Sequence, residues 1–331
     1  MRMLSGLGSL LVAALCAVSV CATPDTVKGN VNPVADPTLC KSSSGTYFLF
    51  STAPGIEIRT SPDLVTWTLV GLVWPNGASW TDEYTLTTNG NLWAPDCTVI
   101  DGEFYLYYAA SSFGSQNSAI FFAKSSTGEP GSFTNEGLVT STVTGDTYNA
   151  IDPNLIIGNP YLAPRRCLAH TILVNGNWYL SLGSFWSGIK LITLGSSTGK
   201  PSNSAVTSLA ERTADSGAIE ASVIWQAGEY FYLFSSWDKC CDGTSSTYNI
   251  RFGRATSIDG PYVDESGVDL LNGGGTLLLG TQGSDVGPGG QDLFLDSNGN
   301  TIMVYHYYTT AGTLLGINKL SFSSGWPVIS G

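Results

Sequence analysis

The sequence predicts an all-β protein and, more specifically, a five-bladed β-propeller. The chain contains five similar stretches in which an acidic residue precedes a turn and an apolar strand. After the first 22 residues, no window has a sustained apolar period of 3.6 residues, so long helices are not expected. The repeating units are roughly 50 to 75 residues long, a length that suits propeller blades.

Each repeat has the same local design. A Gly-containing turn follows the acidic residue, because glycine adopts the positive φ that tight hairpin turns need. An apolar strand comes next, aromatic in four of the five units, and such residues suit a pleated surface. We expect these strands at residues 45–51, 102–106, 176–180, 228–233 and 299–304. A third apolar run follows in several units, at residues 56–59, 119–123 and 248–252.

The acidic residues of the repeats are predicted to share one environment. They are Asp36, Asp96, Asp152, Glu220 and Asp292. The first strand of each propeller blade lines the central channel, so we expect all five side chains to point toward one axial cavity. A β-sandwich is the alternative fold, but it gives no reason for an acid at one register in every unit.

Residues 1–22 are predicted to be a signal peptide. Arg2 precedes a mostly apolar run over residues 10–20, and small residues surround a cleavage site after Ala22. The run is too short to cross a bilayer, and no other segment is long and apolar enough to do so. We therefore expect a secreted, extracellular protein in which residues 23–331 form a single propeller catalytic domain.

The charge of the mature chain narrows the classes of partner. Residues 23–331 carry 13 basic and 26 acidic residues, a net charge of −13. A strongly acidic protein is a poor partner for nucleic acid, acidic membranes or polyanionic pectin. A neutral substrate suits this chain better, and we expect no nucleic acid or membrane partner and a monomer.

Five cysteines remain after the predicted cleavage: Cys40, Cys97, Cys167, Cys240 and Cys241. Secretion permits disulfides, but an odd number leaves one cysteine unpaired. The alternative, a structural metal site, would need two more ligands near the adjacent pair of cysteines and is less favoured.

A stretch near residues 158–171 breaks the repeat, because the third acid-to-glycine spacing is much longer than the others. It contains the odd cysteine and one of the two histidines, His170. It is either a surface excursion between blade strands or foreign to the protein, for example a retained intron. Sequencing the transcript across this region distinguishes the two.

Three of the repeated acids suit glycoside hydrolysis. Asp36, Asp152 and Glu220 each stand just before an apolar strand, and a proline follows both aspartates. Like charges that converge in a partly dry site push pKa values apart, so one carboxyl stays protonated while another remains a base. Cleavage of a glycosidic bond needs such a pair. The alternative is that each acid only caps a turn or pairs with an arginine.

Aromatic residues cluster near these acids. Trp93 lies three residues before Asp96, and Phe113 and Trp186 follow the second strands of their units. These strand ends should open on one face of a propeller, where sugar rings can stack. Trp93 and Phe113 are the predicted sugar-lining pair. The alternative for any one of these aromatics is a core position.

The sequence resembles glycoside hydrolase family 43, and most closely its secreted endo-1,5-α-L-arabinanases. The resemblance covers about residues 31 to 328, in which the 158–171 stretch has no counterpart. The motifs that carry it are Ala35-Asp36-Pro37, Asn91-Leu92-Trp93-Ala94-Pro95-Asp96, Tyr148-Asn149-Ala150-Ile151-Asp152-Pro153, Gly183-Ser184-Phe185-Trp186-Ser187-Gly188, Ile219-Glu220-Ala221-Ser222 and Trp237-Asp238-Lys239-Cys240-Cys241.

The resemblance implies a five-bladed propeller of inverting hydrolases. It implies that Asp36 is the general base, that Glu220 is the general acid, and that Asp152 orients Glu220 and raises its pKa. The predicted substrate-binding residues are Trp93, Phe113, Asn149 and Trp186. The family also places a metal, usually calcium, in the central channel, and His306 stands at the position expected for its ligand. The alternative for His306 is a packed strand histidine.

One departure from the family pattern is Ala35, which replaces the histidine that often precedes the base. The leading functional hypothesis is an endo-acting arabinanase that cuts internal α-1,5 bonds of arabinan, a side chain of pectin. One alternative is an exo-acting α-L-arabinofuranosidase or β-xylosidase of the same fold. Another is a non-catalytic carbohydrate-binding propeller.

Overall fold

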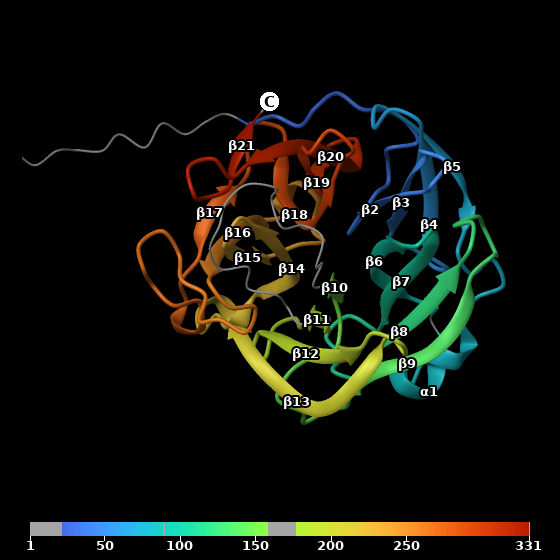
Figure 1. Ribbon diagram of the computed structural model, residues 1–331, viewed down its shortest axis with the longest axis horizontal. Helices are drawn as coiled ribbons and strands as arrows, with labels where there is room; N and C mark the ends of the chain where they lie inside the picture. Colours follow the sequence, from blue (N-terminus) through green and yellow to red (C-terminus); the bar gives the residue numbers. More distant parts are fainter. Residues whose placement is uncertain (1–21, 89, 158–176, 331) are drawn as a thin grey trace, which may run out of the picture.

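Five small, mainly antiparallel sheets surround a central axis, as Figure 1 shows for this computed structural model. The structure describes residues 22–88, 90–157 and 177–330. The predicted β-propeller is therefore confirmed. In these ranges the only α-helix is α1 (Asp82–Thr85). Short 3₁₀ helices are η1 (Ser79–Thr81), η2 (Asp215–Gly217), η3 (Gly243–Ser245) and η4 (Leu270–Asn272).

Within each of the first two blades, the strands follow one another in chain order from the axis outward. Blade one consists of β2 (Thr38–Lys41), β3 (Tyr47–Ser51), β4 (Glu57–Ser61) and β5 (Thr66–Leu72), with β1 (Lys28–Gly29) at its outer edge. Blade two consists of β6 (Leu92–Ile100), β7 (Glu103–Ala110), β8 (Ser118–Ser125) and β9 (Thr134–Thr142).

The remaining three blades repeat this order. Blade three consists of β10 (Asn154–Ile157), β11 (Trp178–Leu182), β12 (Ile189–Gly195) and β13 (Lys200–Ala210). Blade four consists of β14 (Ile219–Ala227), β15 (Tyr230–Trp237), β16 (Asn249–Ala255) and β17 (Thr276–Leu279). Blade five consists of β18 (Val286–Leu295), β19 (Thr301–Thr309), β20 (Gly312–Ser321) and β21 (Val328–Ser330). The predicted second and third strands correspond to those observed within a few residues.

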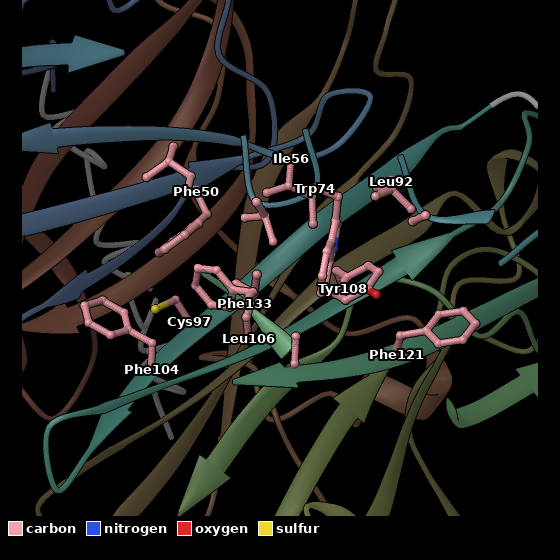
Figure 2. Close-up of a cluster of buried hydrophobic side chains, with 14 of the residues drawn as sticks. Phe50, Ile56, Trp74, Leu92, Cys97, Phe104, Leu106, Tyr108, Phe121 and Phe133 are labelled. Atoms are coloured by element: carbon pink, nitrogen blue, oxygen red, sulfur yellow. The ribbon is translucent and has the colours of Figure 1, made fainter. Parts of the chain in front are cut away.

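The hydrophobic core lies between the blades. On β7, Leu106 and Tyr108 pack toward blade one, whereas Tyr107 and Ala109 pack toward blade three. This alternation follows from the two-residue period of a strand, which directs successive side chains to opposite faces. Figure 2 shows the cluster between blades one and two, where aromatic rings fill much of the space. Apolar residues on both faces of the second strands therefore hold neighbouring blades together.

The N-terminal segment closes the ring, which the repeats alone did not predict. The Asp25 N–H donates to the carbonyl of Ile317 on β20 (2.8 Å), so the segment begins against blade five. It then reaches blade one, where β1 pairs in parallel with β5. Val31 packs in the hydrophobic cluster between these two blades. The first and last blades are thus joined by backbone hydrogen bonds as well as by apolar contacts.

Four of the cysteines form two disulfides. Cys40 on β2 is bonded to Cys97 on β6, which links blades one and two near the axis. Cys240 is bonded to its neighbour Cys241. Cys167 and the 158–171 stretch lie outside the described residues. No helix in the described ranges is long and apolar enough to cross a membrane.

Candidate active site

Each innermost strand begins with, or contains, an irregularity that sets the position of its acidic residue. The first residue of each irregularity has a left-handed backbone: Asp36 (φ 44°), Ala94 (φ 42°), Asp152 (φ 56°), Ala221 (φ 50°) and Gly290 (φ 58°). In blades two, four and five the strand pairing shifts register across this point. A bulge of this kind bends a strand and redirects its side chains.

The five repeated acids therefore do not occupy one register, contrary to the sequence-based expectation. Asp36 and Asp152 are themselves the left-handed residues, and Glu220 comes one residue before its own. Asp96 and Asp292 come two residues after theirs. Offsets of one or two residues move a side chain to another face or another depth in the channel. The acids consequently form two groups.

The first group, which we call the acid cluster, consists of Asp36, Asp152 and Glu220. Its members line a cavity of about 1000 Å³ at the propeller axis. The other predicted site residues line the same cavity: Trp93, Phe113, Asn149, Trp186 and His306. The structure thus brings together all eight residues predicted from the sequence.

Asp36 is held by two neighbouring blades. Its Oδ2 accepts a hydrogen bond from the Thr52 hydroxyl (2.6 Å), and its backbone N–H donates to Nδ1 of His306 (3.1 Å). Its Oδ1 lies 3.5 Å from the same ring nitrogen, and 30% of its side chain is exposed. The carboxylate is therefore fixed in direction and still open to the cavity.

Glu220 is held by two hydroxyl groups. Ser184 donates to Oε2 (2.7 Å) and Tyr248 donates to Oε1 (2.8 Å). Burial raises the pKa of Glu220 above its ordinary value, and the charge of Asp36 adds to this, although both hydroxyls act in the opposite direction. The sequence analysis assigned no role to Ser184 or Tyr248. Both lie in or near quoted segments, but a serine and a tyrosine carry no charge pattern that would mark them.

Asp152 acts on the segment that carries Glu220. Its Oδ2 accepts a hydrogen bond from the backbone N–H of Ala221, the next residue in the chain (2.9 Å). Burial raises the pKa of Asp152 well above its usual value, and the charges of Glu220 and Asp36 raise it further. Asp152 and Glu220 therefore titrate as a coupled pair, in which at least one proton persists above the ordinary carboxyl range.

The second group of acids, Asp96 and Asp292, is buried along the same channel, and together with the equivalent Thr38 and Asn154 it forms what we call the belt. Each of these four residues accepts a hydrogen bond from a backbone N–H on the innermost strand of the following blade, at 2.8–3.0 Å. Val223 occupies the equivalent position in blade four and has no polar group to do this. The belt thus joins blades five, one, two, three and four in turn, and the step from blade four to blade five lacks this bond.

The belt acids have perturbed protonation. Burial, with the charge of Asp292, raises the pKa of Asp96 to about 8. Burial raises the pKa of Asp292 to about 6. Both accept hydrogen bonds from N–H groups, which favour the charged form, but burial outweighs them. These carboxyls face only a small void of about 30 Å³ and have no access to a large substrate.

The predicted binding residues differ in exposure. Phe113 is 77% exposed and contacts Trp93, with ring centroids 5.1 Å apart. Trp186 is 42% exposed. Asn149 is buried, yet its Oδ1 has no hydrogen-bond partner although it lines the cavity. An unpaired buried carbonyl is costly, so a ligand hydroxyl is the natural donor to it.

His306 does not present a free ring nitrogen to the channel. Nδ1 accepts from the Asp36 N–H, and Nε2 lies 3.0 Å from the hydroxyl of Tyr308. Burial lowers the pKa of His306, so the neutral ring is favoured. Within the described ranges, no group of three or more His, Cys, Asp or Glu side chains is arranged to hold a metal. Direct metal ligation by His306 would therefore require one of these contacts to open, and the bond to Nδ1 holds the ring beside Asp36.

Comparisons with known proteins agree with this geometry. The family described as "Glycosyl hydrolases family 43" matches residues 31–327. The extracellular endo-alpha-(1->5)-L-arabinanase 1 of Bacillus subtilis (strain 168) is 42% identical over 298 residues, covering 88% of this chain and 86% of that protein.

Two solved structures are also similar. The GH43 endo-arabinanase from Bacillus licheniformis is 39% identical and superposes with a TM-score of 0.81, covering 92% of this chain and 99% of that chain. An exo-1,5-alpha-L-arabinanase from a bovine ruminal metagenomic library is 34% identical with a TM-score of 0.80, covering 90% and 97%. Similar folds in this group therefore carry names for both modes of cleavage.

Proposed function

The chain belongs to glycosyl hydrolase family 43, and from this premise we propose that it is an inverting endo-1,5-α-L-arabinanase. The observation that carries the proposal is the acid cluster on the wall of a large axial cavity. Two of its carboxyls have raised pKa values and the third, Asp36, is open to the cavity. The same arrangement argues against a non-catalytic binding propeller.

The proposed reaction uses one acid and one base. Asp36 takes a proton from water, and the water oxygen attacks the anomeric carbon. The bond from that carbon to the leaving oxygen breaks, and Glu220 gives its proton to that oxygen. The raised pKa of Glu220 favours the protonated form that this step needs. Asp152 positions Glu220 through the Ala221 backbone, and His306 positions Asp36.

The shape of the site favours endo action. A second hollow adjoins the axial cavity, and both are lined by Phe113 and Trp186. It continues toward residues 144–146, which follow β9, the last strand of blade two. A polymer could therefore extend beyond the acid cluster in this direction. The exo alternative is supported by the exo-1,5-alpha-L-arabinanase that has a similar fold.

The direct test is incubation of the purified protein with linear arabinan. We expect oligosaccharides of mixed length to appear early, because cuts fall within the chain. Intact polymer after long incubation would count against the proposal. Release of a single short product, or activity on nitrophenyl arabinoside or xyloside alone, would favour the exo alternative.

The proposal includes the compartment and the substrate class. Secretion after removal of residues 1–22 is supported by the extracellular name of the Bacillus relative and by the signal-like N-terminus. A neutral arabinan suits a net charge of −13 on residues 23–331. Mass spectrometry of the protein from a culture medium, with Thr23 as the first residue, would test the cleavage site.

Calcium in the central channel stays a prediction. A cation beside His306 would need waters to complete its shell, and the contact between His306 and Tyr308 would have to open. No step of the reaction is assigned to it. Removal of divalent cations with a chelator tests the prediction: calcium binding predicts a lower Tm that added calcium restores, whereas an unchanged Tm contradicts it.

A further inference from the structure

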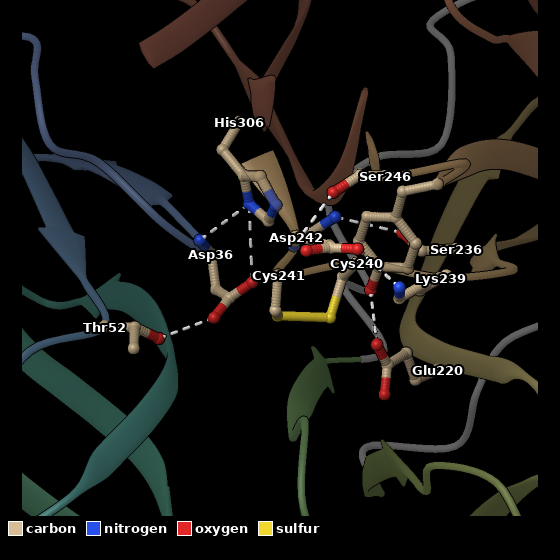
Figure 3. Close-up of a disulfide and its surroundings, with 12 residues drawn as sticks. Asp36, Thr52, Glu220, Ser236, Lys239, Cys240, Cys241, Asp242, Ser246 and His306 are labelled. Atoms are coloured by element: carbon tan, nitrogen blue, oxygen red, sulfur yellow. Dashed lines mark hydrogen bonds and ion pairs between the residues drawn. A yellow bond between two sulfur atoms is a disulfide. The ribbon is translucent and has the colours of Figure 1, made fainter. Parts of the chain in front are cut away.

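The Cys240–Cys241 disulfide lies in the wall of the axial cavity, close to the acid cluster. Both cysteines line the cavity, Cys240 being half-buried and Cys241 exposed. Figure 3 shows the bonded sulfurs in the region between the side chains of Asp36 and Glu220. The reaction proposed above gives this disulfide no role, and a buried structural disulfide would not need to face the substrate.

The loop between β15 and β16 holds the disulfide rigidly. The Lys239 carbonyl accepts from the Thr247 N–H (2.9 Å), and the Lys239 N–H donates to the Thr247 hydroxyl (3.2 Å). The Asp242 N–H donates to the Ser246 hydroxyl (3.1 Å), and the Cys241 N–H donates to the Tyr308 hydroxyl (2.9 Å). A contact surface fixed before binding loses little entropy when a ligand settles on it.

The exposed apolar surface of the cavity is uneven. Blade two contributes Phe113, which is 77% exposed. The disulfide comes from blade four and approaches blade five, which lie across the ring from blade two (Figure 1). The rings beside the disulfide, Tyr248 and Tyr308, are buried, and their hydroxyls are already bonded to protein groups. The disulfide is therefore the apolar group that this end of the described cavity wall presents.

We propose that the Cys240–Cys241 disulfide is a sugar-binding platform that holds an arabinofuranosyl residue at the end of the cavity opposite Phe113. Sulfur is large, polarizable and weakly hydrated, so it packs well against the C–H face of a sugar. An enzyme that cuts inside a chain must hold sugars on both sides of the broken bond. This inference rests on the proposed function and adds the group that holds the chain on the side away from the aromatic pair.

The test compares two disulfide-free variants. Cys240→Ala/Cys241→Ala removes the platform. Cys40→Ala/Cys97→Ala removes the buried disulfide between blades one and two and serves as the matched control. KM, kcat and the pH profile are measured on linear α-1,5-arabino-oligosaccharides of increasing length, together with Tm for each protein.

We expect Cys240→Ala/Cys241→Ala to raise KM for the longest substrates about three- to tenfold, as loss of one packing contact would. Its pH profile should match that of the wild type, and its products should shift in length. The control should lower Tm and leave KM unchanged. Unchanged KM and products in Cys240→Ala/Cys241→Ala would overturn the inference. So would an equal fall in kcat at every length with a shifted pH profile, since that indicates a structural role alone.

A direct binding measurement gives an independent readout. Calorimetry in the inactive Glu220→Gln background should show weaker binding of the longest oligosaccharide when both cysteines are also replaced. Equal affinities would contradict the platform. A wild-type protein that neither binds nor cleaves any arabinan would overturn the proposed function, an outcome distinct from an active wild type with an unaffected variant.

Discussion

The acid cluster and the belt lie along one channel and use similar side chains, yet they differ in their access to the large axial cavity. All three cluster residues line the cavity of about 1000 Å³, whereas no belt residue lines it, and Asp96, Asn154 and Asp292 border a void of about 30 Å³. Asp36 accepts a hydrogen bond from the Thr52 hydroxyl and stays partly exposed. Asp292 is buried and accepts a hydrogen bond from the Leu39 N–H of the next blade. Two residues along the chain therefore separate the proposed catalytic environment from a structural one.

The largest expected effect comes from the acid cluster. Asp36→Asn, Asp152→Asn and Glu220→Gln should each lower kcat on arabinan by about two to four orders of magnitude, because each removes a proton donor, its acceptor or its positioning group. Tm should change little. Glu229→Gln, at an exposed turn, is the matched control and should retain full activity. Near-normal turnover in any of the three would remove that residue from the cluster.

The belt should show the opposite result. Asp292→Ala removes the acceptor for three hydrogen bonds, which the Thr38 hydroxyl and the backbone N–H groups of Leu39 and Leu293 donate. We expect the free energy of unfolding to fall by about 2–4 kcal/mol, measured by urea denaturation. The folded fraction should keep kcat. Asp259→Ala, at an exposed position, should change neither quantity. A large loss of kcat with unchanged stability would contradict the division into two groups.

A smaller effect tests the electrostatics of the cluster. Ser184 and Tyr248 donate to the Glu220 carboxylate, so Ser184→Ala or Tyr248→Phe should raise the pKa of Glu220 further. The protonated acid would then persist to higher pH, and the basic limb of kcat/KM should move upward. The control is Ser187→Ala, because the Ser187 hydroxyl donates to the Thr147 carbonyl and not to Glu220. A downward or absent shift in both variants would argue against Glu220 as the acid.

The smallest effect concerns the pH dependence of stability. The pKa of Asp96 is about 8 in the folded protein against an ordinary value of 3.8, so the folded state holds an extra proton between these values. This contribution to stability is complete below about pH 4 and is lost as pH rises toward about 8. Asn does not titrate, so Asp96→Asn should show a flatter Tm across this window and should gain stability relative to the wild type as pH rises. Parallel Tm curves for both proteins would contradict the raised pKa.

Much of the fold was predictable from local chemistry. Glycine turns and alternating apolar strands fix the blades, and their fivefold repetition fixes the propeller. The side chains of the site were also predictable, because acids and aromatics before or after apolar strands fall at strand ends. Asp36, Glu220 and Phe113 all line the cavity as expected.

The remaining features depend on three-dimensional packing. The two levels of acids follow from bulges that shift register by a residue, and Ala94 or Ala221 gives no local sign of a left-handed backbone. Ser184 and Tyr248 become recognisable only when blades three and four bring them to Glu220. The ring closure includes a backbone hydrogen bond between Asp25 and Ile317, which no side-chain pattern encodes.

The stereochemistry of the first product tests the central claim most directly. If Asp36 activates water and Glu220 protonates the leaving oxygen from the other side, a single displacement inverts the anomeric carbon. Proton NMR of the first minutes of hydrolysis of a linear α-1,5-arabino-oligosaccharide should therefore show the β-anomer of the new reducing end before mutarotation. Initial accumulation of the α-anomer would contradict the assigned roles of Asp36 and Glu220.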